Sequence, residues 1–116
     1  MITVYGIPNC DVIRKTTNWL NAHKIPFRFH DYKQQGISAE KLQDWCNQVG
    51  YETIFNKRST TWKELDPKQQ ASVIDAAVAI PVMVHHTSII KRPVIEKNGK
   101  VVAVGFDEKK LLQVFR

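Results

Sequence analysis

The chain opens, after its first methionine, with Ile2-Thr3-Val4-Tyr5-Gly6-Ile7-Pro8-Asn9-Cys10. Ile2 and Val4 have the alternate spacing of a short strand, and a glycine and a proline then mark a turn just before a helical pattern begins. The stretch therefore predicts a strand, a tight turn and a helix start, with the thiol of Cys10 at the junction between strand and helix.

The position of Cys10 favours a reactive thiol. A sulfur at a helix start lies near unpaired backbone N–H groups and the positive end of the helix dipole, and both favour the nucleophilic thiolate. Arg14 and Lys15 follow about one helical turn later, so at least one cation can turn back toward the sulfur. The alternative is an ordinary small apolar residue packed under the first strand. The turn, the helix start and the cations together favour the reactive thiol.

Length and composition limit the class of protein. The 116 residues, 43% of them hydrophobic, predict one soluble globular domain. No apolar run is long enough to span a membrane and no signal peptide is recognisable, so we expect a cytoplasmic protein and no membrane partner. The 17 Lys and Arg against 11 Asp and Glu favour anionic partners. Because these cations form no basic tract interleaved with aromatic residues, nucleic acid is not expected as a partner.

Cysteine and histidine spacing predicts no bound metal. Cys10 and Cys46 are too few for a disulfide framework, and no Cys/His spacing resembles a zinc site. His85 and His86 are adjacent, so their side chains point in different directions. Cys46 lies on the apolar face of a predicted helix and is interpreted as a core residue. A disulfide with Cys10 stays open as the alternative.

The first half of the chain predicts a βαβ unit followed by a helix. A strand over residues 2–5, a helix over about 11–23 and an extended segment from Pro26 to Asp31 form that unit, with parallel strands. Ser38 is the predicted N-cap of the next helix and Gly50 its end. The apolar face of this helix is expected to consist of Leu42, Trp45, Cys46 and Val49.

The second half predicts helices and then a ββα unit. Asp66-Pro67 is typical of a helix start, and apolar positions at helical spacing follow it at Val73, Ile74, Ala77 and Ile80. Asn98-Gly99 predicts a two-residue hairpin turn between strands over 94–96 and 101–104. Asp107 is the predicted N-cap of a closing helix, whose apolar residues are Leu111, Leu112 and Phe115.

The element order βαβ, helices, ββα predicts an α/β, thioredoxin-like (glutaredoxin-like) fold. We expect a single domain over residues 1–116, with a four-stranded mixed sheet and a helical insertion at about 36–88. Motifs along the whole chain resemble the ArsC/Spx/YffB family of thioredoxin-fold proteins, and among them the YffB-like branch. The matching stretches are 5–10 with Arg14-Lys15, 29–33, 44–46, 56–62, 89–94 and 104–106.

The resemblance implies that Cys10 is the reactive thiol and that Arg92-Pro93 is a cis peptide beside it. Arg92 could then hold an oxyanion or a carboxylate of glutathione in a bidentate manner. Taken alone, Pro93 would indicate only the start of a strand, with a solvated arginine before it.

The sequence departs from two branches of this family. The arsenate reductases use three arginines around the cysteine; Arg92 matches one, whereas Asn56 and Gly105 stand at the other two positions. Arg58 could substitute for the second, but a shift of two residues re-aims the side chain. The Spx regulators typically carry a second cysteine three residues after the first, where this chain has Ile13. Arsenate reduction and an Spx-like regulator that binds RNA polymerase therefore remain as alternatives, the latter because residues 104–106 resemble Spx.

The function that the sequence favours is a glutathione-dependent thiol reductase with one reactive cysteine. A lone thiol needs an external thiol to resolve its mixed disulfide, and we expect glutathione as co-substrate and no bound cofactor. The expected reaction is reduction of a disulfide or an oxidised small substrate, so that the partner is a small-molecule or protein thiol substrate in its oxidised form. The protein is expected to be a monomer. Arg14 and Lys15 are the predicted thiolate-stabilising residues. The predicted substrate and glutathione contacts are Asn9, Arg58, Arg92 and Pro93.

Overall fold

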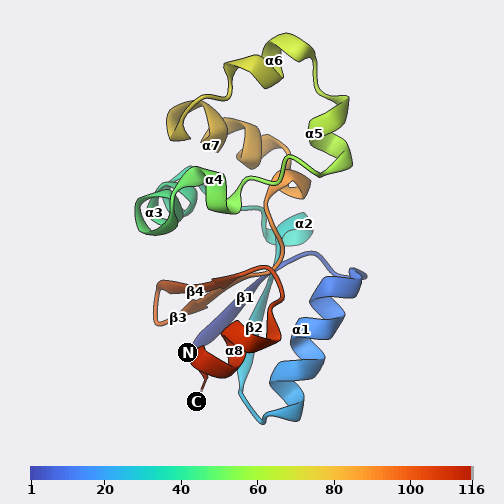
Figure 1. Ribbon diagram of the computed structural model, residues 1–116, viewed down its shortest axis with the longest axis vertical. Helices are drawn as coiled ribbons and strands as arrows, with labels where there is room; N and C mark the ends of the chain where they lie inside the picture. The colour runs from blue at the N-terminus through green and yellow to red at the C-terminus, as the bar shows by residue number, and fades with distance from the viewer. Residues whose placement is uncertain (116) are drawn as a thin grey trace. The chain divides into compact units, whose positions relative to one another are not determined.

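A four-stranded mixed sheet is the centre of the fold. The computed structural model describes residues 1–115, and its sheet has the strand order β2-β1-β3-β4 (Figure 1). The central strand β1 (Ile2–Gly6) pairs in parallel with β2 (Phe27–Asp31) and antiparallel with β3 (Val94–Lys97). The edge strand β4 (Lys100–Val104) runs antiparallel to β3. This mixed sheet with its helices confirms the predicted α/β, thioredoxin-like fold.

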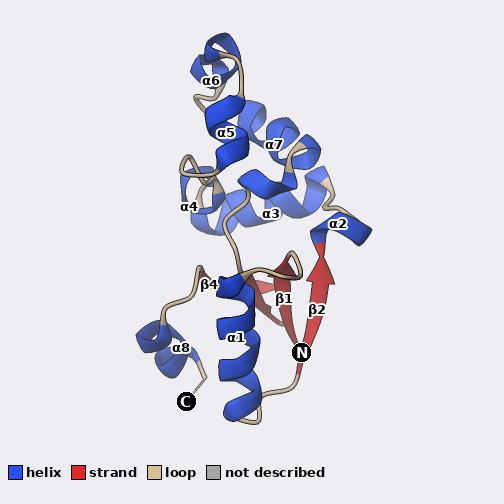
Figure 2. Cartoon of the chain, turned by 90° about the vertical axis from the view of Figure 1, so that its right-hand side faces the viewer, coloured by secondary structure: helices blue, strands red, loops and turns tan. Residues whose placement is uncertain are grey.

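The chain forms two compact units. The first contains residues 1–35 and 92–115, and the second contains Gly36–Lys91. The helices of the first unit are α1 (Asp11–Ala22), the short α2 (Tyr32–Gln35) and the closing α8 (Glu108–Val114). Figure 2 shows α1 running alongside the sheet, with its first residue at the end where β1 finishes. No helix within residues 1–115 is long and apolar enough to cross a membrane.

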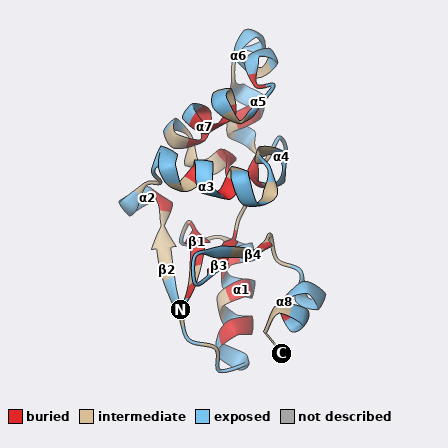
Figure 3. Ribbon diagram, turned by 90° about the vertical axis from the view of Figure 1, so that its left-hand side faces the viewer, coloured by how far each residue is buried: buried red, intermediate tan, exposed pale blue. Residues whose placement is uncertain are grey.

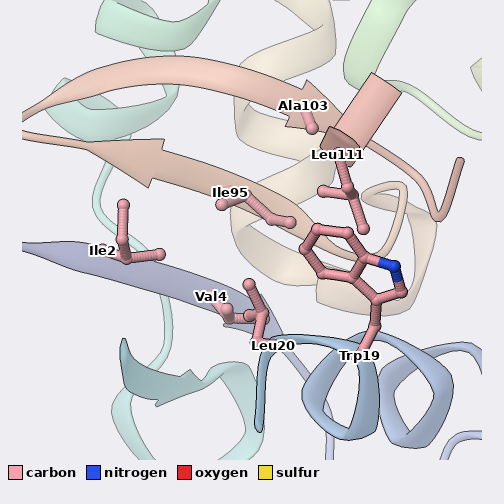
Figure 4. Packing of buried hydrophobic residues seen from close by; sticks show 7 residues of the cluster. All are labelled: Ile2, Val4, Trp19, Leu20, Ile95, Ala103 and Leu111. Carbon is pink, nitrogen blue, oxygen red and sulfur yellow. The ribbon is translucent and has the colours of Figure 1, made fainter. Parts of the chain in front are cut away.

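The core of the first unit lies between one face of the sheet and the helices α1 and α8. Alternate strand residues supply it from the sheet, because successive side chains point to opposite faces. Trp19 and Leu20 of α1 close it from one side and Leu111 of α8 from the other (Figure 4). The cluster consists of Ile2, Val4, Trp19, Leu20, Ile95, Ala103 and Leu111. This packing holds α1 against β1 and so fixes the helix that begins beside Cys10.

The second unit is helical. Its helices are α3 (Ala39–Val49), α4 (Tyr51–Ile54), α5 (Thr60–Glu64), α6 (Pro67–Ser72) and α7 (Ala76–His85), and the 3₁₀ turn η1 (Thr87–Ile89) follows them. Ser38 caps α3, as predicted: its hydroxyl oxygen accepts a hydrogen bond from Lys41 N at 3.1 Å. Asp66 caps α6, and Pro67 is the first residue of that helix, also as predicted. Gly50 ends α3.

One helical stretch of the sequence prediction is wrong. The apolar spacing from Val73 to Ile80 suggested one face of one helix, but α6 ends at Ser72 and a new helix begins after Asp75. The carboxylate of Asp75 accepts a hydrogen bond from Val78 N at 3.1 Å, which caps α7 separately. Ile74 falls in the break and is 74% exposed, whereas Val73 and Ile80 are buried.

The C-terminal hairpin and helix follow the prediction with one exception. Asn98 and Gly99 both have positive φ, 52° and 83°, as a two-residue hairpin turn requires. The carboxylate of Asp107 accepts from two backbone N–H groups of α8. Leu111 is buried, but Leu112 is 49% exposed and was wrongly expected on the apolar face. Helix α8 is only seven residues long, so a narrow stripe of it meets the sheet.

Candidate functional site

Cys10 is the N-cap residue of α1. Its backbone is extended, with φ −117° and ψ 129°, and its carbonyl accepts the first helical hydrogen bond from Arg14 N at 2.9 Å. The side chain makes no capping hydrogen bond, so the sulfur is not used to satisfy the helix end. The thiol is free and partly exposed. Asn9 just before it has φ 57°, a left-handed conformation that asparagine tolerates better than most residues.

A close approach of strand and helix fixes the turn that carries Cys10. A Cβ at Gly6 would lie 2.4 Å from Ile13 Cδ1, a distance that real contacts do not reach. Glycine at position 6 therefore lets Ile13, on the first turn of α1, pack directly on the end of β1. Since Ile13 is buried, this contact sets where the helix start and its N-cap residue lie.

The two cations predicted beside the thiol are both exposed. Arg14 donates a hydrogen bond to the carboxylate of Asp11 and forms an ion pair with it. Asp11 is thus an acidic residue in the first turn that sequence reasoning did not weigh, and it binds the guanidinium that was expected to turn toward Cys10. The assignment of Arg14 and Lys15 as thiolate-stabilising residues stays a prediction.

Arg92 and Pro93 lie at the same end of the sheet as the Cys10 turn. Their peptide bond is cis, which confirms what the family resemblance implied. Val94 pairs with Tyr5 in the register of β1 and β3, so the two residues before Val94 lie beside the end of β1. Pro93 is buried, and its carbonyl accepts a 2.7 Å hydrogen bond from Gly105 N, whereas Arg92 is half-buried. Their predicted contact with glutathione is untested.

A buried polar cluster lies on the sheet face opposite the apolar core. Tyr5 and Glu96 alternate with the core residues Val4 and Ile95, and the Tyr5 hydroxyl donates to Glu96 Oε1 at 2.8 Å. The Tyr5 ring stacks on that of Tyr32, with centroids 6.4 Å apart, where β2 passes into α2. All three residues are at most 6% exposed. Figure 3 shows the buried stretch of β1, the strand that carries Tyr5.

Electrostatics link this cluster to Arg92. Burial raises the pKa of Tyr32 well above its ordinary value, and Tyr5 and Glu96 raise it further, while the nearby Arg92 guanidinium lowers it. The raised pKa keeps the Tyr32 hydroxyl protonated. Sequence reasoning missed this cluster as part of the site, although its residues lie in or next to the matched motifs. Only the strand register shows that they meet.

Arg58 and Cys46 belong to the second unit. Arg58 is exposed, and its backbone N–H donates to Asn56 Oδ1 at 3.0 Å, which makes a tight turn before α5. Cys46 on α3 is a free, partly buried thiol, and burial raises its pKa. Substrate contact by Arg58 stays a prediction, as does the role of Asn9 in the first unit. Within residues 1–115 no three His, Cys, Asp or Glu side chains group as metal ligands.

The chain is similar to known proteins over nearly its full length. An uncharacterized protein of Haemophilus influenzae is 41% identical over 115 residues, 99% of both chains. The global transcriptional regulator Spx of Streptococcus pneumoniae is 26% identical, covering 96% of this chain and 83% of its own length.

Solved structures are also similar to the chain over nearly its full length. The YFFB protein superposes with a TM-score of 0.94 at 39% identity, and both chains are covered completely. An arsenate reductase (ArsC) related protein from Brucella melitensis has a TM-score of 0.77 and 39% identity, with 99% of this chain and 94% of that one covered. The family model for the ArsC family matches residues 5–114. A match over that length, which includes the Cys10 turn and the Arg92-Pro93 bond, shows that the chain belongs to the ArsC family.

Proposed function

We propose that this ArsC-family protein is a thiol oxidoreductase that uses Cys10 as its single reactive thiol and glutathione as its reducing co-substrate. The observation that carries the proposal is the position of Cys10 as N-cap of α1, with a sulfur that makes no hydrogen bond to the helix end. The unpaired N–H groups and the dipole of a twelve-residue helix stabilise a thiolate there.

The reaction consists of two thiol–disulfide exchanges. In the first, the Cys10 thiolate attacks a substrate disulfide R–S–S–R′, the Cys10–S–S–R bond forms, and R′–S⁻ leaves and takes a proton from water. In the second, a glutathione thiolate attacks the R sulfur, which restores the Cys10 thiolate and gives the disulfide of R with glutathione. No second protein cysteine is needed, in keeping with Ile13 at the position where a resolving cysteine would follow.

Arg92 and Pro93 are proposed to orient the second thiol. The cation and the neighbouring backbone lie at the sheet end from which the Cys10 turn emerges. Arginine binds carboxylates through two parallel N–H bonds, and glutathione carries two carboxylates. Asn9 and Arg58 are proposed substrate contacts, and Lys15 supports the thiolate.

A regulator is the second candidate, because the Spx of Streptococcus pneumoniae matches over 96% of this chain. Arsenate reduction has less support: position 105 carries no side chain and has φ 81°, so it offers no arginine. A stable complex with RNA polymerase that survives Cys10→Ser, in the absence of any turnover, would favour the regulator.

Turnover with defined substrates tests the proposal. Bis(2-hydroxyethyl) disulfide and, separately, arsenate are offered with reduced glutathione, and the oxidised products are quantified. We expect turnover of the disulfide that is lost in Cys10→Ser and kept in Cys46→Ser, the matched control for loss of a thiol. Equal rates for the wild type and Cys10→Ser would refute the proposed function.

A further inference from the structure

Tyr32 carries a buried hydroxyl without a partner. Among residues 1–115, its Oη and Trp19 Nε1 are the buried side-chain polar atoms that make no hydrogen bond. Tyr32 is only 2% exposed, so its hydroxyl is closed to bulk solvent. A buried donor that is left unpaired is unfavourable, and such an atom in a folded protein calls for an explanation.

The surroundings of Tyr32 are polar and charged, whereas Trp19 belongs to the apolar core. Tyr32 follows Asp31, which pairs with Gly6, and Arg92 lies two residues before Val94, which pairs with Tyr5, so Tyr32 and Arg92 lie at the same end of the sheet. The Arg92 guanidinium also acts electrostatically on the Tyr32 hydroxyl. Glu96 Oε1 accepts a hydrogen bond from Tyr5, whereas the Tyr32 hydroxyl makes none. The tyrosine rings are stacked at 6.4 Å, so Tyr32 is held in place by its ring while its hydroxyl has no acceptor.

Arg92 is the second group that lacks an acceptor. Within residues 1–115 the guanidinium makes no ion pair with a carboxylate. It is half-buried, and arginine offers five N–H donors in a planar fork. A cation and a neutral hydroxyl donor that lie at the same end of the sheet, both without an anionic acceptor, are complementary to an anion.

We propose that Tyr32 is a further ligand-binding residue of the Cys10 site, and that its hydroxyl donates to the anionic oxygen acceptor that Arg92 binds. The acceptor is either a carboxylate of glutathione or an oxyanion. The inference rests on the proposed function where it takes glutathione as a ligand. Since the hydroxyl is closed to solvent in the free protein, binding includes a local rearrangement that brings the acceptor to it.

The first test compares the thermal stability of two matched variants without ligand. Tyr32→Phe removes an unpaired hydroxyl, so Tm should rise by roughly 2–6 °C. Tyr5→Phe removes a hydroxyl that donates to Glu96, so Tm should fall. A lower Tm for Tyr32→Phe would show that a partner inside the folded protein, such as a buried water, already satisfies the hydroxyl. That result, or an unchanged Tm, would overturn the proposal.

The second test measures ligand affinity by calorimetry in the Cys10→Ser background, where no disulfide can form at position 10. The probes are reduced glutathione, its glycine monoethyl ester and inorganic phosphate. Tyr32→Phe should weaken binding of the recognised anion about tenfold. Weaker binding of glutathione, with a comparable loss on esterification, identifies the glycine carboxylate; weaker binding of phosphate identifies an oxyanion.

Equal affinities in the presence and absence of the Tyr32 hydroxyl would overturn the inference, as would no binding of any of the three probes. The proposed function fails by a different result, namely turnover that persists in Cys10→Ser. The two failures are therefore distinguishable.

Discussion

Gly6 and Ile13 approach so closely that a methyl group on Gly6 would lie 2.4 Å from Ile13 Cδ1. This contact joins the end of the central strand to the first turn of α1, and Cys10 lies in the turn between them. The position of the thiol thus depends on a glycine whose role is packing, not backbone freedom. A substitution there should affect both stability and reactivity.

Gly6→Ala should lower the free energy of unfolding by about 1–3 kcal/mol, because Ile13 is buried and cannot move away without cost. Ile13→Val removes the Cδ1 atom, so the double variant should regain part of the loss. Urea unfolding of the single and double variants measures the coupling. Strictly additive effects would mean that the two side chains do not clash.

Asp11→Asn should increase the reactivity of Cys10. The carboxylate of Asp11 holds the Arg14 guanidinium, and its own charge near the helix start opposes a thiolate. Removal of one such charge should raise the alkylation rate of Cys10 at neutral pH about two- to fivefold at low salt. The rate is measured with iodoacetamide in a Cys46→Ser background. High salt should reduce the difference between variants, and a rate that does not change would contradict this account of the pair.

The parts of the fold that the sequence predicts well are helix starts and turns set by neighbouring residues. Asn98-Gly99, Ser38, Asp66 and Asp107 act through their own neighbours in the chain, and the structure has each in its expected role. The break after Ser72 was missed because apolar spacing continues across it, and only the capping bond of Asp75 reveals two helices.

The candidate site also has a part that is local in sequence and a part that only the fold brings together. The Cys10 turn is local in sequence and was predicted, but Tyr5 and Glu96 are 91 residues apart and meet through strand pairing. Asp11 and Arg14 are also close in sequence, but their ion pair was not predicted. Whether Arg14 turns toward Asp11 or toward Cys10 depends on its rotamer, which spacing along the chain does not determine.

Cys46 should titrate at higher pH than an ordinary thiol, because burial raises its pKa. A raised folded-state pKa means that stability is fully present below the ordinary value of about 8.5 and is lost as pH rises through the folded-state pKa. In a Cys10→Ser background, raising the pH above about 8.5 should therefore lower the stability more than it does in the Cys10→Ser/Cys46→Ser double variant. Thermal melts at pH 7 and in alkaline buffer measure the difference. The same alkaline loss in both proteins would contradict the prediction.

Arg92→Ala should reduce kcat/KM for glutathione about ten- to a hundredfold, because a charge-assisted hydrogen bond to a carboxylate is lost. Lys91→Ala is the matched control, since it removes the same charge from the neighbouring half-buried position. Initial rates at varied glutathione give the comparison. An equal effect of both substitutions would indicate a general electrostatic contribution and not a specific contact.

The most direct test of the central claim is the intact mass of the protein after incubation with oxidised glutathione, followed by reduced glutathione. We predict one glutathione adduct in the wild type and in Cys46→Ser, none in Cys10→Ser, and release of the adduct by reduced glutathione. An adduct that forms on Cys46 and not on Cys10, or a Cys10 that forms none, would contradict the assignment of Cys10 as the reactive thiol.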